Sequence, residues 1–160
     1  MIREAKPFCM NFEKISRFFA LSCHDKMAFI EALFFLLISK LIVITMPFRK
    51  AAQLMGALNV EPVADISQLK AAKSARVKLF VAMGAANVPW NSVCLDQALA
   101  GAFMLQRRHI PYGLCIGVKR DLTEDKLRAH AWILCGGKIL IGGIRSLQFT
   151  RVAVFSKDFR

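Results

Sequence analysis

One cysteine and one histidine, Cys94 and His130, have the types and the order that nucleophilic cysteine chemistry requires. Cys94 stands where a helix is predicted to begin, and the amides and dipole of a first helical turn favour a thiolate. The same amides could stabilise an oxyanion. His130 opens a predicted strand, and an imidazole there could take and return the thiol proton. The alternatives are ordinary ones: a buried free thiol and a structural strand histidine.

Three neighbouring side chains are candidates for the cleft or the oxyanion site: Trp90, Asn91 and Trp132. Asn91 either caps the helix or lends its amide to an oxyanion, and Ser92 competes for the capping role. Trp132 shares a strand face with His130 and is either a core residue or a cleft wall. Trp90 is expected to pack beneath the start of the helix.

The other cysteines and histidines offer no metal-site spacing. The chain has five cysteines and three histidines, with no CxxC pair, so we expect neither a metal nor a cofactor. An odd number of free thiols indicates a reducing compartment, and residues 1–26 carry charges throughout, unlike a cleavable signal peptide. A cytoplasmic location follows. Cys23 with His24 is a weak rival dyad, and Cys115 and Cys135 fall within predicted strands and are expected in the core.

Length and charge limit the classes of function. The 160 residues form one predicted domain, 1–160, with a helical part (1–84) and a part with a helix and an antiparallel sheet (85–160). The net charge of +12 favours an acidic partner: nucleic acid, anionic lipid or an acidic protein. No nucleic-acid-binding signature is present, and we expect no nucleic acid partner.

The most apolar stretch, 27–50, predicts a mostly buried helix that ends before Pro47. A membrane-spanning helix needs about 20 apolar residues, and Lys40 at mid-bilayer would cost roughly 3 kcal/mol. The open alternatives are a partner-facing helix and a helix on a membrane surface, which the following Arg49-Lys50 pair favours.

Three further helices are predicted in the first half, at 11–22, around 48–58, and from Asp65 to about Gly84. Asp65 and Gln68 resemble a capping box. The third of these helices is the most basic element, and its charges form either a solvated face or a docking surface for an acidic partner; these charges are Lys70, Lys73, Arg76 and Lys78.

The second half predicts a helix over 93–108 and then strands over 112–120, 129–135, 138–143 and 150–155. Gly136-Gly137 between two strand-like runs is a hairpin signal. The hairpin places Cys135 opposite Lys138. The fold class is therefore α+β, with a papain/transglutaminase-like core in which a cysteine-bearing helix packs on a small antiparallel sheet.

The ordered motifs resemble the transglutaminase-like leader peptidases of lasso-peptide and microcin maturation. The resemblance rests on an apolar helix followed by Pro-Phe-Arg, on the small-residue helix ending in basic residues, and on Trp90, Cys94-Leu95 and His130-Ala131-Trp132. It implies a cysteine peptidase that removes the leader from a ribosomally made precursor peptide. It also implies the stand-alone form, which works with a separate leader-binding recognition protein and a macrolactam cyclase.

The sequence departs from this family at one position. The family has an aspartate about twelve residues after the histidine, and here that residue is Gly142. The hairpin register puts Gly142 opposite Ala131 and Gly143 opposite His130. A backbone carbonyl or a water could orient His130 instead, and Asp96 is a weak substitute. The alternative is a catalytically degenerate copy that binds the precursor or its complex.

Overall fold

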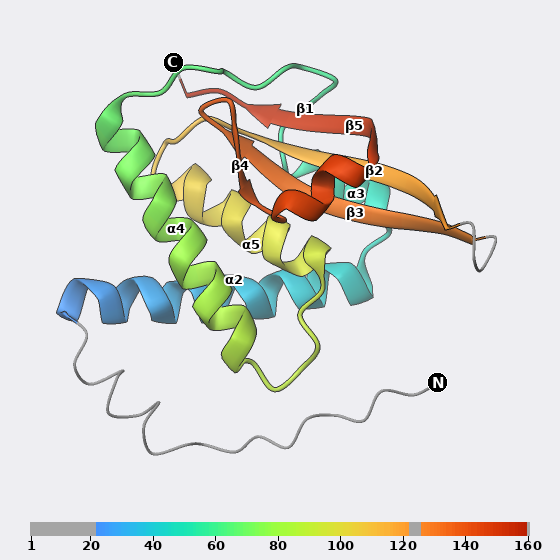
Figure 1. Ribbon diagram of the computed structural model, residues 1–160. Helices are drawn as coiled ribbons and strands as arrows, with labels where there is room; N and C mark the ends of the chain where they lie inside the picture. The colour runs from blue at the N-terminus through green and yellow to red at the C-terminus, as the bar shows by residue number, and fades with distance from the viewer. Residues whose placement is uncertain (1–21, 122–125, 160) are drawn as a thin grey trace.

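Helix α5 lies between an antiparallel sheet and two further helices (Figure 1). The computed structural model describes residues 22–121 and 126–159. The sheet packs on α5, and α2 and α4 pack on the same helix from other sides. The predicted α+β fold is confirmed. The elements are α2 (Cys23–Thr45), α3 (Phe48–Gln53), β1 (Ala57–Leu58), α4 (Gln68–Asn87), α5 (Cys94–Arg107), β2 (Tyr112–Asp121), β3 (Lys126–Cys135), β4 (Lys138–Ile141), the 3₁₀ helix η1 (Ile144–Gln148) and β5 (Thr150–Lys157).

The four predicted strands are confirmed as β2 to β5, and they form a sheet of order β1-β5-β2-β3-β4. Short β1 was not predicted. The Gly136-Gly137 hairpin is also confirmed: both residues have positive φ, 56° and 68°, as a two-residue hairpin turn of this kind requires. Cys135 pairs with Lys138, as expected.

A bulge in this hairpin makes the expected register beyond Ile139 wrong. Leu134 pairs with Ile139 but Ile133 pairs with Ile141, so β4 carries one extra residue. The partners of β3 therefore shift by one position. Gly142 lies against Trp132 and not opposite Ala131, and a Cβ built on Gly142 would be 2.4 Å from the Trp132 Cβ.

Helix α2 ends before Pro47, as predicted, but the expectation that it is mostly buried is wrong. Its C-cap is Met46, and the last helical residue is Thr45. Its buried residues lie on one face and are Ala28, Ala32, Leu36 and Ser39. The opposite face is apolar and exposed. Hydrophobicity alone could not separate the two faces, because apolar side chains occupy both.

Helix α4 begins three residues later than expected. Ser67 is its N-cap and accepts a hydrogen bond from the Lys70 amide at 3.3 Å, so the predicted Asp65 cap is wrong. Lys73 and Lys78 are exposed, in keeping with a solvated face. Short α3 confirms part of the helix expected around 48–58. The helix predicted over 11–22 lies outside the described residues, except for Ser22, which is the N-cap of α2.

Two apolar clusters lie on opposite faces of the sheet. Ala131 and Ile133 of β3 belong to the main core, which also contains α5. Trp132, between them in the sequence, belongs to a smaller cluster with Cys115 and Val154. Alternate residues of a strand point to opposite faces, so β3 contributes to both clusters.

Candidate functional site

Cys94 is the first residue of α5, as predicted, and is half-buried against the main core. Neither Asn91 nor Ser92 caps the helix. The carboxylate of Asp96 does so instead, because its Oδ2 accepts a hydrogen bond from the Val93 amide at 3.1 Å. An acid at the third position of a helix satisfies a free amide and complements the helix dipole. The sequence signal for this cap was Asp96 itself, three residues after Val93.

A lysine from a distant helix compensates the buried charge of Asp96. The Asp96 side chain has no exposed surface, and its Oδ2 is 3.5 Å from the Nζ of Lys40 on α2. Lys40 Nζ also donates to the Asn91 backbone oxygen at 3.4 Å. The lysine that interrupts the apolar helix therefore holds both the loop before Cys94 and the cap of α5. Sequence reasoning missed this role of Lys40, because no local pattern links α2 to residue 96.

Three buried polar atoms around the start of α5 have no hydrogen-bond partner within the described residues. They are Trp90 Nε1, Ser92 Oγ and Asp96 Oδ1. An unpaired buried donor is costly to a fold, and such groups call for a functional or structural explanation. Trp90, predicted to pack under the helix start, thus brings an unused N–H donor close to Cys94 in sequence.

His130 lies beside the smaller cluster and contacts two of its aromatic rings. Its imidazole stacks on Trp132 with centroids 6.1 Å apart and planes at 22°, and it lies 5.0 Å from the Phe149 ring. Its Nε2 is 3.1 Å from the Gly142 carbonyl oxygen. A carbonyl can only accept, so Nε2 carries a proton, and in the neutral ring the lone pair is on Nδ1. Trp132 is itself buried, so it is both a core residue and a wall beside His130.

Residue 142 can accommodate only glycine in this arrangement. Its φ is +105°, and a Cβ there would lie 2.4 Å from Trp132 Cβ and 3.0 Å from Trp132 Cα. A carboxylate side chain is therefore excluded at the position where the resembling family has its aspartate. The backbone carbonyl of the same residue occupies the orienting position instead. Asp96 is engaged by Val93 and Lys40, so it does not orient His130.

The thiol of Cys94 and the imidazole of His130 lie against different clusters. Cys94 contacts the main core, whereas His130 contacts the cluster that contains Trp132. Both residues are described, and no hydrogen bond joins them. The geometry thus brings His130, Trp132 and Gly142 together and leaves Cys94 unbonded to them. Because alternate residues of β3 face opposite sides of the sheet, His130 and Trp132 lie on the face opposite the α5 core that Cys94 contacts.

Among the other described thiols, Cys115 and Cys135 lie in the core, as expected from the sequence. Cys115 and Cys135 are buried, and burial raises the pKa of each thiol, so neither is a ready nucleophile. Cys23 is exposed. The rival dyad has no support, because Arg76 Nη2 donates to His24 Nδ1 at 2.6 Å. Among residues 22–121 and 126–159, no group of three or more His, Cys, Asp or Glu side chains could hold a metal ion.

A cysteine that begins a helix, packed on an antiparallel sheet that carries a histidine, defines the papain- and transglutaminase-like class of architecture. The chain belongs to the transglutaminase-like superfamily, whose family model (Transglut_core3) matches residues 41–154. This superfamily includes cysteine-dependent enzymes and cysteine peptidases. No curated protein and no solved structure matches the chain.

Proposed function

We propose that this protein is a cytoplasmic cysteine peptidase that removes the leader from a ribosomally synthesised, lasso-type precursor peptide. The proposal rests on the superfamily match and on the ordered motifs around Cys94 and His130. Its partners in this proposal are the precursor, a separate leader-binding recognition protein and a macrolactam cyclase. The net charge of +12 would attract these partners if the precursor or the recognition protein is acidic.

The proposed reaction requires the His130 imidazole to reach the α5 side of the sheet, where it takes the proton of Cys94 and the thiolate attacks the scissile carbonyl carbon. The amides of the first turn of α5 stabilise the oxyanion, with Asn91 or Trp90 as further donors. The C–N bond breaks, and the leaving amine takes a proton from the imidazolium. Water then hydrolyses the thioester, which releases the leader as a carboxylic acid and regenerates the thiol.

The observation that carries this proposal is the hydrogen bond from His130 Nε2 to the Gly142 oxygen. It fixes the ring in the tautomer that leaves Nδ1 free to accept a thiol proton. A neutral carbonyl stabilises the imidazolium less than a carboxylate does. We therefore expect catalysis that is slower than in relatives with the aspartate, but not abolished.

The first test measures thiol reactivity and needs no substrate. The rate of alkylation by iodoacetamide at neutral pH is followed at each cysteine by peptide mass spectrometry. Exposed Cys23 serves as the internal reference, and we expect Cys94 to react roughly tenfold faster or more. His130→Gln should bring the Cys94 rate down to that of Cys23.

The second test measures cleavage of a lasso-type precursor in the presence of its leader-binding protein. The wild-type chain and Cys23→Ala should release leader and core peptides, whereas Cys94→Ala should release neither while remaining folded. Cleavage by Cys94→Ala would contradict the proposal.

A second candidate function is a catalytically inactive binding protein of the same maturation complex. It is favoured by the missing hydrogen bond between Cys94 and His130, together with the exclusion of a carboxylate at residue 142. In that case Cys94 and Cys23 would react at similar rates. The wild type and Cys94→Ala would then bind the precursor equally and cleave none of it.

A further inference from the structure

The outer face of α2 presents one continuous line of large apolar side chains. They recur at alternating spacings of three and four residues, so they lie along one side of the helix. At about 1.5 Å per residue the line is roughly 25 Å long. Between 44% and 69% of each residue is exposed, and the residues are Met27, Ile30, Phe34, Leu37, Leu41 and Ile44.

The opposite face of α2 fixes the helix parallel to the surface of the protein. That face packs on α4 and α5, and the two charged residues that interrupt its apolar run, Glu31 and Lys40, bond to the two ends of α5. Glu31 pairs with Arg108, and Lys40 pairs with Asp96. By length and composition alone, α2 could cross a membrane. A crossing would remove it from the core and break both pairs, so an in-plane position is the one compatible with the fold.

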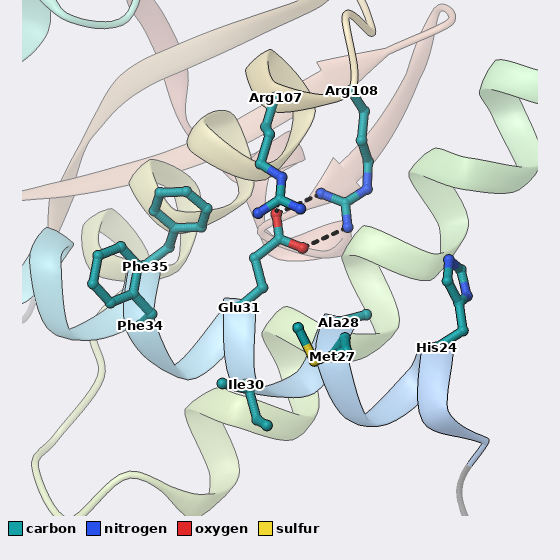
Figure 2. A pocket seen from close by; sticks show the side chains of 9 residues that line it. All are labelled: His24, Met27, Ala28, Ile30, Glu31, Phe34, Phe35, Arg107 and Arg108. Carbon is teal, nitrogen blue, oxygen red and sulfur yellow. Dashed lines mark hydrogen bonds and ion pairs between the residues drawn. The ribbon is translucent and has the colours of Figure 1, made fainter.

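Cationic groups lie beside this line. A groove of about 360 Å³ opens between α2 and the end of α5, and Figure 2 shows both arginines above an apolar floor. Glu31 accepts from Arg108 at 2.7 and 2.6 Å, and Arg107 Nε is 3.5 Å from the same carboxylate. Two guanidinium groups thus share one carboxylate, and Arg107 is 68% exposed. Exposed Lys50 follows the other end of α2.

We propose that the outer face of α2 binds in-plane to an anionic membrane surface. The apolar line enters the boundary between headgroups and acyl chains, and Arg107 and Lys50 contact lipid phosphates. Charge complementarity selects this occupant over a second copy, because each copy carries +12 and would bring its cations against those of its partner.

The test is co-sedimentation of the full chain with vesicles of phosphatidylcholine and phosphatidylglycerol, compared with phosphatidylcholine alone. Binding is expected to the anionic vesicles and to weaken with added salt. The double variant Leu37→Gln/Leu41→Gln should lower the partition coefficient roughly tenfold or more. The matched control is Leu127→Gln/Leu147→Gln, which makes the same change at two leucines that are 75% and 71% exposed on β3 and η1, and its binding should be unchanged.

Three results would overturn the proposal. The first is no binding to anionic vesicles, and the second is equal binding by the α2 variant and its control. The third is light scattering that shows an oligomer without vesicles, converted to monomer by the α2 variant alone, which would assign the face to a second copy. Circular dichroism of both variants checks that they are folded. None of these outcomes depends on the activity of Cys94.

Discussion

Removing the amino group of Lys40 should destabilise the protein, because it leaves the buried carboxylate of Asp96 without its cation. In Lys40→Met the methylene stem is largely kept, but the carboxylate of Asp96 loses its cation. That carboxylate has no exposed surface, and its Oδ1 already lacks a partner. Its remaining hydrogen bond comes from the Val93 amide. The cost therefore comes from a buried charge without compensation.

The size of the effect follows from burial and distance. Breaking one partner out of a buried ion pair costs about 3–5 kcal/mol. Lys40 is 25% exposed and its Nζ is 3.5 Å from the Asp96 oxygen, so water screens part of the attraction. We therefore expect the free energy of unfolding to fall by about 3 kcal/mol, the lower end of that range. This corresponds to a fall in Tm of about 6–12 °C.

The assay is urea unfolding of four proteins that form a double-mutant cycle: wild type, Lys40→Met, Asp96→Asn and the double variant. Asn at 96 keeps an acceptor for Val93 and removes the charge, so the double variant should be more stable than Lys40→Met alone. Glu61→Gln is the control. The distance from Glu61 to Arg151 is shorter, 2.5 Å, but the Glu61 side chain is 67% exposed. We therefore expect this substitution to lower the free energy of unfolding by less than about 1 kcal/mol. Strictly additive effects of the two substitutions would refute the reasoning.

Two other predictions test the core and the His130 site. Tyr112 is the single tyrosine, and burial raises its pKa to about 12 from 10.0, although a hydrogen bond from Gln106 opposes this. The folded state therefore favours the neutral phenol, and this stability is complete below pH 10 and lost as the pH rises to about 12. Near-ultraviolet absorbance should follow the ionisation of this one phenol. Between pH 10 and about 12, the free energy of unfolding of Tyr112→Phe should fall by about 2–3 kcal/mol less than that of the wild type. Gly142→Asp should not increase the rate of cleavage and should destabilise the fold by about 3 kcal/mol, as should Gly142→Ala. Normal stability of either variant in thermal unfolding would contradict the close approach to Trp132.

The elements with a strong local signal could be predicted from the sequence. The Gly-Gly turn between two strand-like runs specifies a hairpin, because both turn residues need positive φ. Helix α5 is delimited by Pro111 and by the basic residues at its end, and its start at Cys94 agrees with the pattern.

The details that set the site depend on contacts between distant residues, and these have no local signal. The bulge between Ile133 and Leu134 shifts the strand register by one residue, and a regular alternation does not reveal one inserted residue. The cap of α5 was assigned to Asn91 or Ser92 because both have the right side chains, yet Asp96 performs it. Competition between suitable caps is decided by the packing around them.

Two charged residues in the apolar run of α2 connect this helix to the candidate site. Glu31 and Lys40 are on different sides of a helical wheel, and in the sequence they only interrupt an apolar run. In the fold, Glu31 binds Arg108 near the C-terminal end of α5, and Lys40 binds Asp96 in its first turn. The two pairs therefore anchor α5 at both ends, and the Lys40 pair lies within the turn that begins at Cys94. A displacement of α2, whether by a substitution or by binding at its outer face, should therefore first change the positions of Asn91 and Asp96. These two residues join α2 to the first turn of α5, which begins at Cys94.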